Sequence, residues 1–113
     1  MNLLNVTIRE VKKDKISLLP YARFDCFAFV LLFSQKIGEK AESKMKNFTQ
    51  DLIESVLDFG GTFYLPYRVH YTHKQVLKAY PNILKWLSVK KLLDPDYVFQ
   101  SQFFDFLKSI SSH

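Results

Sequence analysis

The chain has 113 residues, a net charge of +5, and a composition that is 48% hydrophobic and 16% aromatic. This length corresponds to one domain, too short to combine a catalytic domain with a nucleotide-binding domain, and the composition excludes an intrinsically disordered chain. A basic balance can indicate binding to nucleic acid or to an anionic membrane, but the lysines are spread along the sequence, which favours solvated helix faces.

The first third of the chain contains two candidate strands. Residues 4–8 alternate apolar and polar side chains, the two-residue period of a half-buried strand. Residues 11–21 are polar and interrupted by Pro20, and we expect a loop there. As a strand, residues 25–33 would present apolar side chains on both faces, so we expect a central strand covered on both sides. Helices of this chain can cover one face, and another domain is the natural cover for the second.

A long helix and a third strand are predicted next. Between residues 38 and 58, apolar residues recur at spacings of three and four, and Gly60 follows as the expected left-handed residue at a helix end. Residues 62–70 alternate again and are predicted as a strand. Pro66 places this strand at a sheet edge or kinks it, and a kink would bring Tyr64 and Tyr67 to one opening.

Helices complete the chain. Residues 72–75 fit a capping box at the start of a short helix. A second helix is predicted over residues 82–93, with Asp94-Pro95 as its stop, and the apolar segment after Ser101 is predicted to be helical. The order of elements predicts an α+β fold: an antiparallel sheet with helices packed on one face, the split β-α-β arrangement of ferredoxin-like folds, and a helical C-terminal tail.

Cys26 is the single cysteine, so an intrachain disulfide is excluded. Its apolar neighbours favour a small core residue over a reactive nucleophile. This usage fits a reducing compartment, and we expect a cytoplasmic protein, with peripheral association to a membrane left open. No apolar run approaches the roughly 20 residues of a membrane helix, so we expect no transmembrane segment. The first ten residues lack the pattern of a signal peptide.

Four polar side chains on or beside the third predicted strand are candidates for a ligand site. Tyr64 and Tyr67 offer phenol groups, Arg68 a fixed cation, and His70 an imidazole that titrates near neutral pH. Together they could bind a polyhydroxylated or anionic ligand. The alternative is that the tyrosines fill a sheet face while Arg68 and His70 are solvated, and the residues alone favour this alternative.

Other site types find little support in the sequence. His70 and His73 lack a ligand spacing and have no clustered carboxylate or cysteine, so we expect no metal. Gly60-Gly61 follows a predicted helix, whereas phosphate-binding glycine loops precede one. A nucleotide site built by this chain alone is therefore not expected.

A longer pattern extends from the double glycine to the end of the chain. It consists of Gly60-Gly61-x-x-Tyr64-Leu65, Thr72, Ala79-Tyr80-Pro81, Trp86, Val89-Lys90, Asp94-Pro95, Val98-Phe99 and Ser101. In this pattern the chain resembles the C-terminal end of FAD-linked oxidases of the vanillyl-alcohol-oxidase type. It is similar to sugar and sugar-lactone oxidases and to the decaprenylphosphoryl-ribose oxidase branch, loosely so upstream of Gly60.

The resemblance implies a two-part enzyme. A larger N-terminal domain would bind FAD, and a C-terminal cap would carry an antiparallel sheet over the flavin ring and line the substrate pocket. Residues 1–93 would then be the cap, and residues 94–113 a tail that docks on the FAD-binding domain, supplied by the same or a neighbouring chain. The whole enzyme would oxidise a sugar-, polyol- or lactone-like alcohol by hydride transfer to the flavin. The isolated chain would be inactive and would self-associate.

The resemblance also assigns roles to individual residues. Tyr64 matches a tyrosine beside the flavin and the substrate, and it is the candidate catalytic and cofactor-contacting residue, with His70 as a second catalytic candidate. Tyr67 matches a pocket position that holds lysine in the ribose-oxidase branch, so a neutral phenol replaces a cation. Cys26 and Ala28 fall on the strand that offers pocket side chains. Arg68 is a further candidate for substrate binding.

Two readings from other classes compete with this one. The first is a free-standing basic α+β module that binds nucleic acid or protein, for which clustered lysines and steep salt dependence would be expected. The second is an interaction domain without a site. The scattered lysines argue against nucleic acid, and none is expected as a partner.

Overall fold

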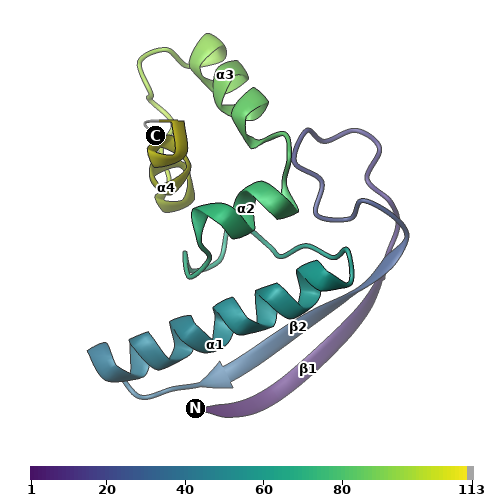
Figure 1. Cartoon of the computed structure of the whole chain (residues 1–113), viewed down its shortest axis with the longest axis vertical. Helices are drawn as coiled ribbons and strands as arrows, with labels where there is room; N and C mark the ends of the chain where they lie inside the picture. Colours follow the sequence, from purple (N-terminus) through teal and green to yellow (C-terminus); the bar gives the residue numbers. More distant parts are fainter. Residues whose placement is uncertain (112–113) are drawn as a thin grey trace.

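The computed structural model describes residues 1–111 and has an α+β fold, with a two-stranded antiparallel sheet and four helices (Figure 1). The strands and helices, in chain order, are β1 (Asn2–Val11), β2 (Cys26–Ser34), α1 (Glu39–Asp58), α2 (His73–Ala79), α3 (Ile83–Leu93) and α4 (Gln102–Ser111). The predicted fold class and the C-terminal helix are confirmed. No helix in this part of the chain is long and apolar enough to cross a bilayer.

The strand pair and α1 form the lower half of the molecule. β1 and β2 are antiparallel, with Val11 opposite Cys26 and a bulge after Leu3. Helix α1 runs along this pair, and the other three helices lie beyond α1 on the side away from the strands (Figure 1). The rings of Phe33 in β2 and Phe48 in α1 meet edge to face at 5.3 Å. Helix α1 therefore packs on one side of the sheet, as predicted, and the other helices pack beyond it.

The hydrophobic core lies among the helices and includes no strand residue within residues 1–111. Its buried members are Ile53, Leu57, Leu65, Tyr71, Val76, Ala79, Tyr80, Ile83 and Leu107. Leu107 belongs to α4, so the predicted tail contributes to the core of this chain. Burial raises the pKa of Tyr71 to about 12 and raises that of Tyr80 further.

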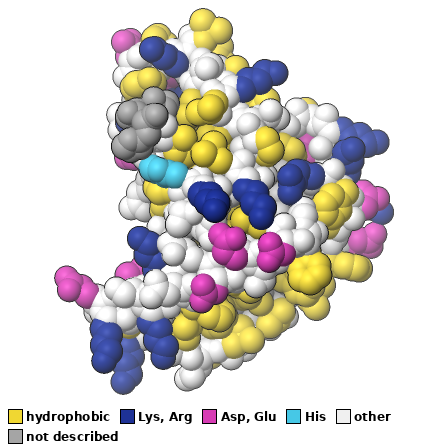
Figure 2. All heavy atoms as spheres, viewed as in Figure 1, with side chains coloured by type: hydrophobic (Ala, Val, Ile, Leu, Met, Phe, Trp, Pro, Cys, Tyr) yellow, Lys and Arg dark blue, Asp and Glu magenta, His cyan; other side chains and the backbone are white. Residues whose placement is uncertain are grey.

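The strands remain largely open to solvent. Phe29 and Val30 are 62% and 38% exposed, and neighbouring strand residues point to opposite faces. Neither face of β2 is therefore fully covered, although the sequence is that of a strand covered on both. Figure 2 shows the hydrophobic side chains as a band along the strand pair, below α1. An apolar surface of this kind on a small sheet usually marks an interaction site.

The predicted third strand over residues 62–70 is wrong. These residues pair with neither strand, and the chain turns at residues 65–67. Pro66 has no N–H to donate, and side chains from other elements take up the carbonyl groups instead. Tyr71 Oη donates to the carbonyl of Leu65 at 3.1 Å, and Gln50 Nε2 donates to that of His70 at 2.7 Å. The hydroxyl of Tyr80 donates to the carbonyl of Phe63.

The double glycine is explained by the end of α1. Gly60 has φ of 75°, in the left-handed region that glycine adopts without strain. Gly61 lies so close to α1 that a Cβ atom there would be 2.6 Å from Cγ1 of Val56. Both glycines are therefore required by the turn that leaves α1.

Three further polar motifs fix helix ends. Thr72 and Gln75 exchange side-chain hydrogen bonds, which confirms the predicted capping box. The carboxylate of Asp94 accepts the N–H groups of the fourth and fifth residues after it at 2.9 and 3.0 Å. A hydrogen bond from Lys90, with help from those N–H groups, lowers the pKa of Asp94. The hydroxyl of Ser101 accepts the N–H of Phe104 at 3.2 Å and caps α4.

Candidate functional site

A pocket of about 690 Å³ lies where the loop after β1, strand β2 and the end of α1 meet. Cys26 and Ala28 of β2 line it together with Tyr64 and Tyr67. These four candidate residues come from two segments far apart in the sequence. Small-molecule sites commonly have volumes of about 300–1,000 Å³, so this pocket has the size of a ligand site.

Tyrosines form one wall of the pocket. The rings of Tyr64 and Tyr67 meet edge to face with their centroids 4.8 Å apart, and Tyr21 meets Tyr64 in the same way at 5.9 Å. The turn at residues 65–67 brings the two predicted tyrosines together, although residues 62–70 do not form the kinked strand that was expected. Tyr64 and Tyr67 are 50% and 64% exposed, so their hydroxyls remain able to donate and accept hydrogen bonds.

Two arginines that were not predicted from the sequence also line the pocket. Arg9 lies on β1 opposite Ala28, and Arg23 lies in the loop before β2. Arg23 Nη2 donates to the carbonyl oxygens of Gly60 and Gly61 at 2.9 and 3.4 Å. Its buried Nε has no hydrogen-bond partner among the residues described. The strand register positions Arg9, and the contact with Gly60 and Gly61 positions Arg23. Neither relationship produces a local pattern in the sequence.

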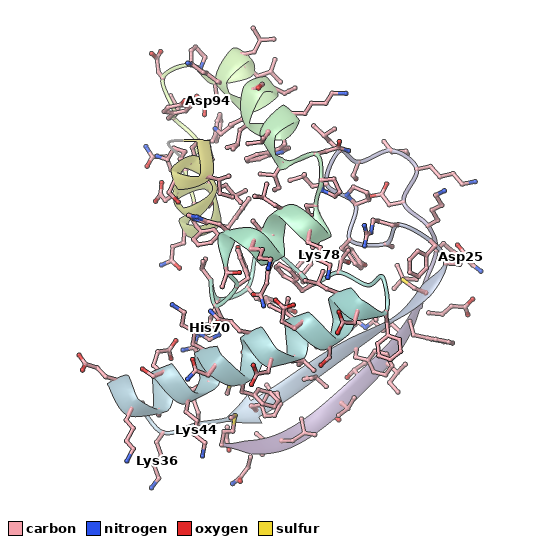
Figure 3. All side chains as sticks on the ribbon, in the orientation of Figure 1. Asp25, Lys36, Lys44, His70, Lys78 and Asp94 are labelled. Carbon is pink, nitrogen blue, oxygen red and sulfur yellow. The ribbon has the colours of Figure 1, made fainter. Side chains whose placement is uncertain are left out.

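Arg68 and His70 are not part of this pocket. Both bind the carboxylate of Glu42, Arg68 through an ion pair and His70 through a 2.7 Å contact from Nε2 to Oε1. Glu42 precedes the pocket residue Val56 by fourteen residues, which is roughly 21 Å along an α-helix. In Figure 3, His70 lies beside α1, and Asp25, at the start of β2, lies at the opposite end of that helix.

The environment of His70 keeps its ring neutral at pH 7. Burial, followed by the charges of Arg68 and Lys46, lowers the pKa of His70 below its ordinary value of 6.5. The carboxylate of Glu42 opposes this shift, but the same carboxylate is shared with Arg68, so burial decides the direction. The ring at neutral pH therefore bonds to Glu42 as an uncharged imidazole, and this contact fixes the segment before α2 against α1.

The residues that could hold a cofactor are limited. The N–H groups of Gly60 and Gly61 donate to carbonyls of α1, so this turn offers no cradle for a diphosphate. The tyrosine wall and the apolar side chains of β2 make this part of the lining largely apolar. Among residues 1–111, no group of three His, Cys, Asp or Glu side chains could hold a metal ion.

No protein-family model matches this chain, and no solved structure matches it significantly. The resemblance to FAD-linked oxidases is carried by the motif pattern alone. The structure gives several of those motif residues a role in the fold: Gly60, Gly61, Thr72, Asp94 and Ser101 all shape turns or helix ends. Tyr64 is the motif residue whose side chain lines the pocket.

Proposed function

We propose that this chain is the C-terminal, substrate-binding part of an FAD-dependent oxidoreductase that oxidises a sugar-, polyol- or lactone-like alcohol. The observation that carries the proposal is the composition of one pocket. Cys26, Ala28, Tyr64 and Tyr67, which the family resemblance associates with a substrate pocket, all line it.

The proposed chemistry divides between the cofactor and this chain. Bound FAD would supply the acceptor for the hydride that leaves the carbinol carbon. The phenols of Tyr64 and Tyr67 bind the substrate hydroxyls, and Tyr64 holds the reacting hydroxyl. Its proton would pass to a base of the partner domain, since no Asp, Glu or His among residues 1–111 lines the pocket. The edge-to-face contact between the two rings orients both phenols. The small side chains of Cys26 and Ala28 leave room for the substrate. His70 lies outside the pocket, and its predicted catalytic role stays a prediction.

The open strands support a partner domain. Phe27 and Phe29 line the pocket and are 66% and 62% exposed. In the proposed enzyme, the FAD-binding domain of the same or a neighbouring chain covers this surface and closes the pocket. The diphosphate of FAD would be held by that domain, because the double-glycine turn here has no free N–H groups for it.

The test is reconstitution. The chain is co-expressed with whatever coding sequence lies directly upstream, and the purified product is mixed without oxygen with sugars, polyols and lactones. We expect the flavin absorbance to bleach, and Tyr64→Phe to slow bleaching about tenfold, since losing a hydrogen bond worth about 1.4 kcal/mol to the reacting hydroxyl corresponds to that factor. The bleaching rate of His70→Ala is measured in the same way, because His70 is the second catalytic candidate.

Two results would refute the proposal at different levels. A complex without flavin, or one that no alcohol bleaches, would refute the function. Unchanged rates in both Tyr64→Phe and His70→Ala would refute the site. Binding of the chain alone to duplex DNA with steep salt dependence would instead favour the rival nucleic-acid module.

A further inference from the structure

The pocket carries positive charge that this chain does not balance. Arg9 and Arg23 line it, and no Asp or Glu does. Arg9 forms no ion pair within residues 1–111. Glu10 and Asp25 both lie within 4 Å of Lys12 Nζ, at 3.1 and 3.7 Å, and neither forms an ion pair with Arg9 in this part of the chain. A guanidinium stays charged at any physiological pH, so both cations persist in the pocket.

Part of the charge of Arg23 is used by the fold. The C-terminal end of a helix carries roughly −0.5 of an elementary charge, and the last turn of α1 contains no basic residue. Arg23 supplies the missing cation through its bonds to Gly60 and Gly61. The two arginines and the helix end therefore leave a net charge of about +1.5 at the pocket. This positive charge favours an anionic ligand, and its size does not separate one negative charge from two.

The donors available favour a carboxylate. Phosphate sites usually draw on free backbone N–H groups, and those of Gly60 and Gly61 are occupied by α1 carbonyls. No lysine lines the pocket. A guanidinium pairs with a carboxylate or a phosphate through two parallel hydrogen bonds, so the preference for a carboxylate rests on the lack of free N–H groups at the double-glycine turn and of a lysine in the lining. The phenols of Tyr64 and Tyr67 lie on another part of the same pocket and suit hydroxyl groups.

We infer that the pocket accepts a hydroxylated organic acid, with its carboxylate at Arg9 and Arg23 and its hydroxyls at the tyrosines. Arg9 is then a determinant of specificity. As a statement about the substrate, the inference rests on the proposed oxidoreductase function. As a statement about binding, it can be measured on this chain without any flavin.

Sodium gluconate is compared with two uncharged six-carbon polyhydroxy compounds: glucose, which is cyclic, and sorbitol, which is an open chain like gluconate. Each is titrated into the full chain at fixed ionic strength and followed by NMR. We expect gluconate to bind at least tenfold more tightly than glucose or sorbitol. We expect Arg9→Gln to weaken gluconate binding at least tenfold and Arg9→Lys to weaken it less. Lys15→Gln removes the same charge from an exposed loop position and should leave binding unchanged.

The outcomes separate this inference from the proposed function. Equal binding of gluconate and sorbitol, no binding of any of the three compounds, or equal effects of Arg9→Gln and Lys15→Gln would overturn the inference. Tighter binding of inorganic phosphate than of gluconate would overturn the choice of carboxylate. Selective gluconate binding by a protein that never acquires flavin would refute the oxidoreductase and leave the inference standing. Flavin bleaching by neutral sugars at a rate that Arg9→Gln leaves unchanged would support the oxidoreductase and overturn the inference about the substrate.

Discussion

Arg23 donates from Nη2 to the carbonyl oxygen of Gly60 at 2.9 Å, and this bond joins the loop before β2 to the end of α1. The hydroxyl of Thr62 donates back to the carbonyl of Tyr21 in the same loop. The loop and the turn after α1 are thus fastened by bonds in both directions. Since both segments line the pocket, its shape depends on these contacts.

Replacing Arg23 should loosen this connection. Arg23→Gln removes the charged donor to Gly60 and Gly61, and hydrogen bonds that involve a charged group are worth about 1.5–3 kcal/mol. Because Arg23 is partly exposed, we expect the free energy of unfolding in urea to fall by about 1–2 kcal/mol. Arg9→Gln, at an exposed strand position, is the control and should change stability little. Equal stability of both variants would contradict the structural role of Arg23.

The two adjacent glycines should respond differently to alanine. A Cβ at Gly61 would lie 2.6 Å from Cγ1 of Val56, a stiff β-branched side chain, so we expect Gly61→Ala to cost about 1–3 kcal/mol. A Cβ at Gly60 meets no atom within 4 Å and is opposed only by the positive φ, at about 1–2 kcal/mol. Val56→Ala combined with Gly61→Ala should recover part of the loss. Chemical denaturation of the three variants measures the difference.

The stability of the chain should fall on mild acidification. The pKa of His70 is lowered in the folded state, so between that value and 6.5 the unfolded chain binds more protons. The contribution of His70 is therefore complete above pH 6.5 and is lost as the pH falls through the folded-state pKa. We expect the urea midpoint to drop over this window, and His70→Gln to remove that part of the drop.

Lys46→Gln provides a graded control for the same effect. Lys46 is exposed and contributes to lowering the pKa of His70, so its removal should narrow the pH window without abolishing it. A pH profile identical in wild type and His70→Gln would show that another group governs the acid response.

The C-terminal segment should separate into a folding part and a docking part. Leu107 is fully buried, so Leu107→Ala should lower the free energy of unfolding by about 2–5 kcal/mol. Phe99 is 78% exposed, and Phe99→Ser should change stability by less than about 0.5 kcal/mol. If the tail docks on the proposed FAD-binding domain, Phe99→Ser should weaken that association. Sedimentation of the two-component complex measures it, and an unchanged complex would argue against docking at Phe99.

The exposed strands should drive self-association of the isolated chain. Ile8 is 59% exposed and lies opposite Phe29 in the sheet, so Ile8→Lys places a charge within the apolar band. We expect sedimentation equilibrium to show a larger monomer fraction than for wild type. Leu84→Lys, at a 53% exposed position on α3, introduces the same charge away from the strands and should have little effect. Equal behaviour of the two variants would place the association elsewhere.

Local signals predicted most of the secondary structure. The strand near Leu4, the capping box at Thr72 and the left-handed Gly60 each depend on a few neighbouring residues, and each is found where expected. The strand is, however, largely exposed and not half-buried. Residues 62–70 were wrongly predicted as a strand because their apolar and polar residues alternate, but the apolar ones pack against helices. Leu65 is buried among helices rather than on a sheet face, and no neighbouring strand is present in the described chain to pair with it.

Only part of the candidate site could be predicted, because only part of it depends on residues that are close in the sequence. Tyr64 and Tyr67 belong to one short turn, so their convergence could be expected from Pro66. The separation of His70 from them depends on Glu42, twenty-eight residues earlier, and the presence of Arg9 depends on the pairing of β1 with β2. Such contacts are set by the tertiary fold, and a single sequence contains no direct record of them.

The way residues 62–70 are held has a consequence for hydrogen exchange. Side chains from α1 and from the residues flanking α2 bind carbonyls of this segment. The N–H groups of Phe63, Tyr64 and Tyr67 have no backbone partner in the described chain. These amides should exchange with solvent rapidly, whereas those between β1 and β2 are protected until the ladder opens. The pocket wall can consequently adjust to a ligand, or change in sequence, without disturbing the register of the sheet.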